Sequence, residues 1–260
     1  MENSETKNPI QVAGRLFLIM ELLAKDGAMG LSQISQSVDL NKSTVHRLLN
    51  SLMYMGYVRQ DAMDGKYSLS FKIVNIANQV MEKMDIVHLV RPYLCELMEQ
   101  TGETVHFVEM DGVDAVYIDK VESHRNSVQM VSRIGNRIPL YRSGVGKAIA
   151  ATMPDEEVRE LWEASKIEKA TPYTITDYQA FYECLGQVRE KGYALDNEEN
   201  EAGVRCIAAA IPDERGRVRY AFSISAPTNR MDDGRILELS EYVLRTKKQL
   251  NQIYSGSDFL

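Results

Sequence analysis

The chain has 260 residues, of which 44% are hydrophobic and 26% charged, and this composition indicates a globular protein of one or two domains. The net charge of −7 argues against a chain that binds nucleic acid over its whole surface. No apolar run is long enough to cross a bilayer, the first residues lack a secretory pattern, and three scattered cysteines argue against a disulfide framework. We therefore expect a cytoplasmic protein that does not contact the membrane.

The charge is unevenly distributed along the chain. Residues 1–70 carry seven basic and seven acidic side chains, whereas the remaining residues carry 23 and 30. A neutral segment ahead of an acidic body permits contact with DNA in the first segment only.

Three helices are predicted in the first segment. Apolar residues recur at helical spacing over 12–23 and over 31–38, and a three-residue connection leads to a third helix over 42–54. Asn41 is placed to cap this third helix. Its apolar side carries Val45, Leu48, Leu49 and Leu52.

A hairpin is predicted directly after these helices, because two short segments rich in β-formers flank Asp64-Gly65. Two helices, a tight turn, a third helix and a hairpin make a winged helix-turn-helix, whose third helix fits the major groove of DNA. Arg47 suits a bidentate contact with guanine, although a polar helix face is more often only solvated. The residues expected to face DNA are Lys42, Ser43, Thr44, His46, Arg47, Asn50 and, on the hairpin, Lys66.

The next helix, over 71–84, is apolar around much of its circumference and therefore needs several neighbours. Two interpretations remain open: a core helix of one domain, or a linker helix that packs on its copy in a dimer. A dimer suits a DNA reader, because two-fold proteins match two half-sites about 34–36 Å apart.

Beyond a further helix over 86–101, strands and helices are mixed, which predicts an α+β domain. Strands are expected over 104–110, 113–121, 127–134, 193–200, 204–212 and 218–226. Helices are expected over 143–153, 154–165, 177–192 and 232–253.

From about Val12 to the last helix, the sequence resembles the IclR family of bacterial transcriptional regulators. The resemblance rests on LSQISQSVDLNKSTVHRLLNSL, RIGNRIPLYRSGVGKAIAA, GYALDNEENEAGVRCIAAAIPD and FSISAPTNRM, which occur in the family's order. It implies a winged helix-turn-helix domain over 9–70, a linker helix over 71–84 and a GAF-like effector-binding domain over 85–256. Within the family the chain is most similar to the KdgR type, which regulates hexuronate and 2-keto-3-deoxygluconate catabolism.

The resemblance also implies a function and partners. We expect a repressor that binds double-stranded operator DNA as a homodimer or a dimer of dimers, without a cofactor. Its DNA affinity would be controlled by a small carboxylate or keto acid, such as 2-keto-3-deoxygluconate or a related sugar acid.

The expected effector site has some chemical support in the residues themselves. The glycines of Ser143-Gly144-Val145-Gly146 let backbone N–H groups approach a carboxylate at a helix start. Two serines alternate along one predicted strand, so their hydroxyls face the same side. The family's effector positions match Gly144, Val145, Asp196, Cys206, Ser223 and Ser225, with Met130 and Leu140 as candidates for an apolar wall.

Other kinds of site fit the sequence less well. GVGK is not a phosphate-binding loop, since Tyr141 stands where the first glycine would be and Ala148 replaces the hydroxyl residue. Cysteines and histidines show no paired zinc spacing, so no metal is expected. The alternative functions are a small-molecule enzyme with an accessory helical domain, which turnover would reveal, and a signalling protein whose winged helix binds protein, which a weak salt dependence would reveal. We expect a regulator and not an enzyme.

Overall fold

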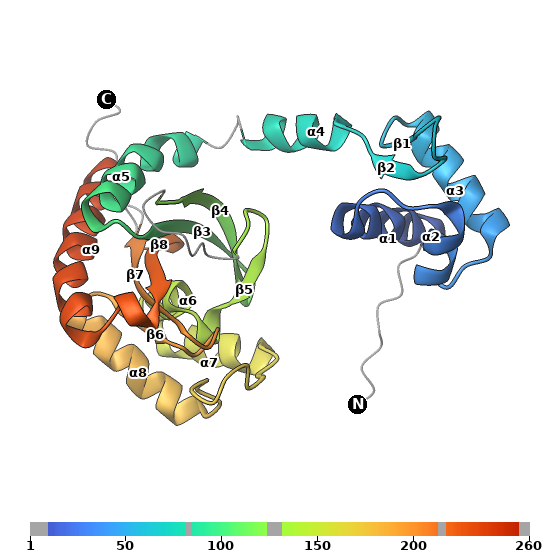
Figure 1. Cartoon of the computed structure of the whole chain (residues 1–260). Helices are drawn as coiled ribbons and strands as arrows, with labels where there is room; N and C mark the ends of the chain where they lie inside the picture. The colour runs from blue at the N-terminus through green and yellow to red at the C-terminus, as the bar shows by residue number, and fades with distance from the viewer. Residues whose placement is uncertain (1–9, 82–84, 124–131, 213–216, 255–260) are drawn as a thin grey trace. The chain divides into compact units, whose positions relative to one another are not determined.

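The computed structural model describes residues 10–81, 85–123, 132–212 and 217–254 (Figure 1). The chain divides into two compact units, Met1–Met84 and Asp85–Leu260. They are called the N-terminal unit and the C-terminal unit below.

The N-terminal unit has the predicted order of elements. It contains α1 (Gln11–Asp26), α2 (Leu31–Ser37), α3 (Lys42–Tyr54), β1 (Val58–Gln60), β2 (Tyr67–Leu69) and α4 (Lys72–Met81). Strands β1 and β2 pair antiparallel as the wing. The core joins α1, α2, α3 and the wing through buried side chains that include Ile19, Ile34, Leu49 and Tyr67.

Helix α3 begins and ends where local chemistry requires. The Asn41 side chain accepts a hydrogen bond from the Thr44 backbone N–H at 2.8 Å, which satisfies one of the free donors of the first turn. After the helix, Gly56 has a φ of +78°, which is unfavourable for any residue with a side chain. The chain reverses direction at this glycine and enters β1.

The C-terminal unit is built on a six-stranded antiparallel sheet with strand order β5-β4-β3-β8-β7-β6. The strands are β3 (Thr104–Asp111), β4 (Asp114–Val121), β5 (Arg137–Pro139), β6 (Ala194–Asn197), β7 (Val204–Pro212) and β8 (Val218–Pro227). The helices are α5 (Asp85–Thr101), α6 (Gly144–Ala150), α7 (Asp155–Ala164), α8 (Tyr178–Lys191) and α9 (Asp233–Tyr254), with short 3-10 turns η1 (Leu140–Arg142) and η2 (Thr228–Arg230).

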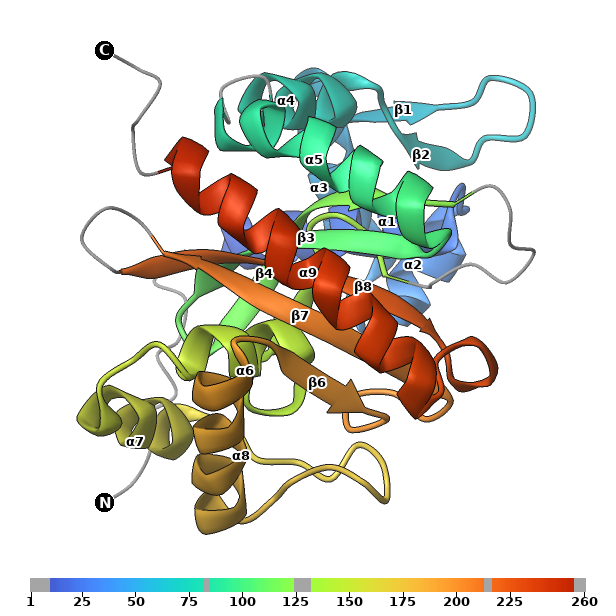
Figure 2. The ribbon, with the colours of Figure 1, turned by 90° about the vertical axis from the view of Figure 1, so that its left-hand side faces the viewer.

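Helices cover both faces of this sheet. Helices α5 and α9 pack together across one face, and α6 lies on the other, with α8 beyond it (Figure 2). Successive side chains of β7 point to opposite faces of the sheet. Ala208 and Ala210 belong to the core under α6, while Ile207 and its period-two neighbours point to the opposite face.

The strand predicted over 127–134 is not found where the structure describes this segment. Residues 127–131 lie outside the described residues, and Ile134 and Gly135 form a turn in which Ile134 is half exposed. The strand that does form, β5, starts at Arg137 and pairs with β4. The predicted strand therefore does not include residues 132–134, because no neighbouring strand pairs with them.

No helix among the described residues has the length and apolar character needed to cross a membrane.

Helix α6 depends on one close approach. A Cβ atom at Gly146 would lie 2.2 Å from both the Cα and the carbonyl oxygen of Leu140, so only glycine fits there. The Ser143 hydroxyl accepts a hydrogen bond from the Gly146 N–H at 3.1 Å and caps the helix at the same point. The glycine therefore fixes how closely α6 sits against the preceding turn.

We expect Gly146→Ala to lower the free energy of unfolding by roughly 1–3 kcal/mol or more, because backbone atoms must move apart. Gly186→Ala is the matched control, since no atom lies within 4 Å of its built Cβ in α8. That substitution should stabilise the chain by up to about 1 kcal/mol. Denaturant unfolding measures both changes, and a Gly146→Ala variant as stable as the wild type would contradict the close approach.

Candidate functional site

Helix α3 separates an apolar side from a polar side. The predicted ridge is buried: Val45 and Leu49 are fully buried, and Leu48 and Leu52 nearly so. The opposite side presents exposed side chains, with Thr44 half-buried between the two. The exposed residues of the predicted DNA-facing set on α3 are Lys42, Ser43, His46, Arg47 and Asn50.

The polar face is partly ordered by its own contacts. Ser43 Oγ donates to Asn41 Oδ1 at 2.8 Å, so the capping side chain holds two donors. One turn later, His46 Nδ1 and Asn50 Nδ2 lie 3.4 Å apart. Among the described residues, none forms a hydrogen bond or an ion pair with the Arg47 side chain. Arg47 is therefore available to an outside acceptor.

The wing places Lys66 beside an acidic residue. Lys66 Nζ lies 3.3 Å from Asp64 Oδ2, and both side chains are about half exposed. The Lys66 backbone N–H also donates to Asp64 Oδ1, and this bond is the main reason that the pKa of Asp64 lies below its usual value. An ion pair this exposed is weak, so a phosphate can compete for Lys66.

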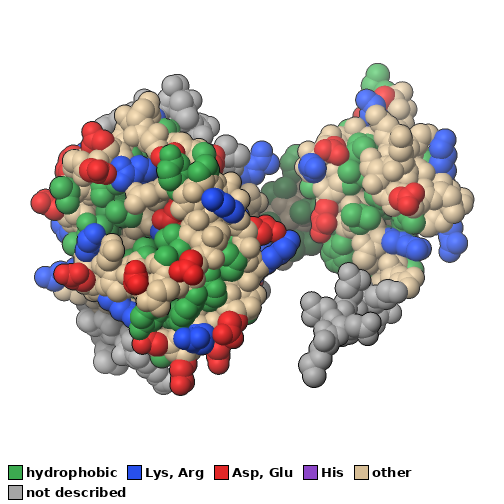
Figure 3. All heavy atoms as spheres, turned by 90° about the horizontal axis from the view of Figure 1, so that it is seen from below, with side chains coloured by type: hydrophobic (Ala, Val, Ile, Leu, Met, Phe, Trp, Pro, Cys, Tyr) green, Lys and Arg blue, Asp and Glu red, His purple; other side chains and the backbone are tan. Residues whose placement is uncertain are grey.

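The surface of the N-terminal unit is mixed in charge. Figure 3 shows lysine and arginine side chains interspersed with acidic ones over the visible face of this unit. The visible face therefore offers no uniformly basic surface that would attract a polyanion by charge alone.

A small cavity lies between the sheet and the turn after β6 in the C-terminal unit. Its volume is about 40 Å³, room for about three water molecules. The lining combines hydroxyl, imidazole, thiol and carboxyl groups with two aliphatic side chains. The residues are His106, Tyr117, Ser132, Ile138, Asp196, Asn200, Glu201, Val204, Cys206 and Ser225.

Strand register brings these residues together from distant parts of the sequence. Asp196 on β6 pairs with Cys206 on β7, which pairs with Ser225 on β8. One strand further, His106 on β3 pairs with Ser223. These side chains share the sheet face that α6 covers, because Ala208 pairs with Ser223 on that face.

His106 is a neutral hydrogen-bonding group in the wall of the cavity. Its Nδ1 lies 3.1 Å from Ser225 Oγ and its Nε2 lies 2.6 Å from Ser132 Oγ. Burial, with a smaller contribution from the Lys120 charge, lowers the pKa of His106 to about 3. The imidazole therefore offers one donor and one acceptor at neutral pH. Burial likewise raises the pKa of the Tyr117 hydroxyl and of the Cys206 thiol, so both stay protonated.

Asp196 is a lining residue whose pKa is shifted to near neutral pH. Burial raises its pKa to about 7, against the opposing charge of Lys147 and with a further increase from Glu199. Its Oδ1 accepts hydrogen bonds from the Glu199 and Asn200 backbone N–H groups at 2.8 and 3.3 Å. The carboxyl group therefore titrates near neutral pH while it closes the turn.

The structure brings together only some of the predicted effector residues. Asp196, Cys206 and Ser225 line the cavity, and Met130 lies outside the described residues. The rest are buried nearby but are not in the lining, with Ser223 Oγ 3.5 Å from Ser225 Oγ. These are Leu140, Gly144, Val145 and Ser223.

Sequence reasoning missed most of the polar lining. Among the described residues, no grouping of histidine, cysteine and carboxylate side chains suits a metal ion. Period-two spacing indicates which residues of a strand share a face, but it does not identify the strand next to it. The missed residues are His106, Tyr117, Ser132, Ile138, Asn200, Glu201 and Val204.

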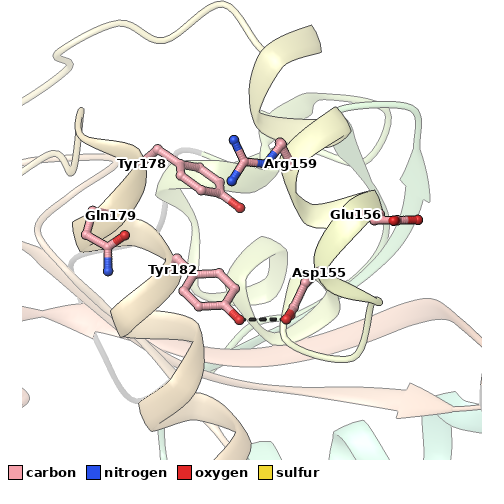
Figure 4. Close-up of a pocket in the computed structure, with 6 residues that line it drawn as sticks. All are labelled: Asp155, Glu156, Arg159, Tyr178, Gln179 and Tyr182. Atoms are coloured by element: carbon pink, nitrogen blue, oxygen red, sulfur yellow. Dashed lines mark hydrogen bonds between the residues drawn. The ribbon is translucent and has the colours of Figure 1, made fainter.

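A second cleft of about 340 Å³ lies between α7 and α8 (Figure 4). Tyr182 donates a hydrogen bond to Asp155 at 2.7 Å, and the Arg159 guanidinium lies 5.0 Å from the centre of the Tyr178 ring. These side chains contact one another across an open surface. The cleft contains no buried polar group that points to a ligand.

Known proteins resemble the chain over both units. Residues 12–62 match the IclR helix-turn-helix domain, and residues 78–252 match the family described as bacterial transcriptional regulator IclR C-terminal. The HTH-type transcriptional regulator KdgR of Escherichia coli is 38% identical over 91% of this chain and 89% of its own length. The regulator XynR of the same organism is 36% identical over 89% of this chain and 92% of its own length.

A solved structure agrees with this relationship. The IclR protein of Thermotoga maritima superimposes with a TM-score of 0.83 at 30% identity, covering 94% of this chain and 98% of that one. The matched families consist of bacterial transcriptional regulators rather than enzymes, and such regulators act on DNA in the cytoplasm. The helix-turn-helix domain implies operator DNA as a partner, and the C-terminal domain implies a small-molecule ligand. The chain therefore belongs to the IclR family of bacterial DNA-binding transcriptional regulators.

Proposed function

We propose that the chain is a repressor that reads its operator with α3 in the major groove. The observation that supports this most directly is the burial of the apolar ridge of α3, which leaves its polar face to solvent. Arg47 would contact a guanine and Asn50 an adenine, since these side chains match those base edges. Lys42, Ser43 and Thr44 at the helix start, His46 beside them, and Lys66 on the wing would contact phosphates or neighbouring bases.

The repressor would bind DNA as a dimer or a dimer of dimers. A groove of about 470 Å³ within the N-terminal unit is lined by side chains of α1, α3, α4 and the connection between α3 and β1, and almost all of its exposed lining is apolar. Phe17 on its rim is 61% exposed, and Val74 and Val80 on α4 are at least half exposed. An exposed apolar surface of this kind marks an interaction site. A second copy of the same surface is the occupant that a two-fold operator requires.

The effector would be a small carboxylate or keto acid, with 2-keto-3-deoxygluconate or a related sugar acid as the leading candidate. The polar lining supports a hydroxylated ligand, because Ser132, Ser225 and His106 supply neutral donors and acceptors. Small-molecule sites usually enclose about 300 Å³ or more, so the 40 Å³ cavity must enlarge to admit such a ligand. A ligand that binds only the enlarged state shifts the population towards it, and DNA affinity changes if the two states bind DNA unequally.

The role of α3 predicts that Arg47→Ala loses operator discrimination. An operator is first selected from random duplex DNA with the wild-type chain, and binding is then measured by fluorescence anisotropy. Loss of one base-reading arginine should cost about 1–3 kcal/mol and relax specificity at one position. Arg159→Ala removes an exposed arginine of α7 as the control and should bind like the wild type. Wild-type discrimination by Arg47→Ala would remove α3 from the operator.

The cavity predicts a different result for each of two neighbouring serines. A thermal-shift screen of 2-keto-3-deoxygluconate, other sugar acids and pyruvate should find a ligand that raises the melting temperature. By calorimetry, Ser225→Ala should weaken that ligand about five- to tenfold through the loss of one hydrogen bond. Ser223→Ala, outside the lining, should change the affinity less. Equal affinities for all three proteins would place the effector elsewhere.

The proposed dimer surface predicts that Phe17→Glu shifts the protein in solution to a smaller oligomer or a monomer. A carboxylate at this exposed position leaves the fold of the unit intact but opposes burial against a second copy. Met63→Glu, 97% exposed at the wing tip, is the control and should keep the wild-type mass. Sedimentation velocity at micromolar concentration distinguishes these states. An unchanged mass for Phe17→Glu would exclude this surface as the interface.

A further inference from the structure

A buried ion pair involves the turn that supplies part of the cavity lining. Lys147 on α6 donates a hydrogen bond to Glu199 Oε1, and their side chains are only 1% and 7% exposed. Glu199 follows β6 in the turn 196–201 and does not line the cavity, whereas Asp196, Asn200 and Glu201 of the same turn do. The pair therefore contacts the turn at a residue that is not part of the cavity lining.

Stability alone does not explain this pair. Removing two charges from water costs about as much as their attraction returns, and well-packed apolar residues in their place are often equally stable. Glu199 Oε2 is also buried without a hydrogen-bond partner among the described residues. An unsatisfied buried oxygen is unfavourable, so an arrangement selected for stability would not retain it.

Hydrogen bonds to backbone carbonyl groups also hold this turn in place. Thr171 and Thr174, both buried, donate hydrogen bonds of 2.6 Å to the carbonyl oxygens of Glu198 and Glu199. Glu198 has a φ of +62°, which is unfavourable for a residue with a side chain and persists only where the surroundings impose it. The turn is therefore a constrained structure with several anchors.

The ion pair joins this turn to α6. Lys147 follows Gly146, whose position is fixed by the Leu140 backbone. The Glu199 N–H, in turn, donates to Asp196 Oδ1 at 2.8 Å. A continuous set of contacts thus runs from α6 through Lys147 and Glu199 to the carboxyl group in the cavity wall.

We propose that Lys147 and Glu199 are positioning residues for effector recognition, which hold the turn 196–201 so that Asp196, Asn200 and Glu201 form the cavity wall. The inference rests on the proposed role of the cavity as the effector site. The two residues do not touch the ligand and act through the turn. Without the pair, the chain still folds but the wall becomes mobile.

The decisive variant replaces both partners, Lys147→Met with Glu199→Leu, because Lys147→Met alone would leave a buried carboxylate unpaired. The matched control is Arg230→Met with Glu103→Leu. That pair is also largely buried, with bonds of 2.8 and 2.9 Å, and neither residue lines the cavity. Denaturant unfolding establishes that each full-length variant is folded. If the double variant does not fold, Glu199→Gln, which keeps the shape of the side chain, takes its place in the same comparison.

The first measurement requires no ligand. Cys206 lines the cavity, so the rate at which iodoacetamide alkylates it, followed by peptide mass spectrometry, reports how often the wall opens. The Lys147/Glu199 variant should react roughly tenfold faster or more at Cys206, with Cys95 as the internal reference. The Arg230/Glu103 variant should react at the wild-type rate. A wild-type rate in the Lys147/Glu199 variant would overturn the positioning role.

The second measurement uses 2-keto-3-deoxygluconate as the probe in calorimetry. If it binds the wild type, the Lys147/Glu199 variant should bind it roughly tenfold more weakly or worse, and the control variant should bind it equally well. Equal affinity in all three proteins would overturn the positioning role. Failure of the wild type to bind contradicts the proposed effector instead, and the Cys206 rates then decide the positioning role by themselves.

Discussion

The C-terminal unit depends on the close packing of α6 against one face of the sheet. A Cβ at Gly144 would lie 3.4 Å from both the Asp196 nitrogen and the Ala208 Cβ, so the helix start meets β6 and β7 at van der Waals distance. Alanine at 208 and 210 leaves room for this approach. On the same face of β7, Ala208 and Ala210 belong to the core under α6, whereas Cys206 lines the cavity. The helix therefore both completes the core and limits the cavity.

The cavity is small and lined mainly by polar side chains, and both properties bear on the proposed binding of an effector. Its buried groups are paired with one another, as His106 is with Ser132 and Ser225. A ligand must replace these contacts as it opens the space, so its hydrogen-bonding groups decide whether binding is favourable. Asp196 adds a group whose pKa lies near 7, so its protonation state can respond to the ligand. Under the proposed function, rearrangement of the wall would give the effector a means of changing the unit's conformation.

In the N-terminal unit, helix α3 contributes both to the core and to the exposed surface. The buried ridge of α3 fixes the helix in its core, and the same 13 residues leave an exposed polar face, which we propose reads DNA. Residues 1–70 carry equal numbers of basic and acidic side chains, so discrimination would depend on individual side chains such as Arg47. The apolar groove lined by residues of α1 and α4 is the surface that we propose for a second copy, which a two-fold operator would require.

The sequence by itself determined the winged helix-turn-helix, the polar face of α3 and the order of most strands and helices, because these follow from local periodicity and capping. The capping role of Asn41 and the apolar ridge of α3 could both be predicted from the sequence alone. Only the tertiary structure decided which residues form the cavity. His106, Asp196, Cys206 and Ser225 lie on four strands, and strand order and register are set by packing between distant segments rather than by local pattern. For the same reason, the contact between Lys147 and Glu199, 52 positions apart, exists only in the folded chain.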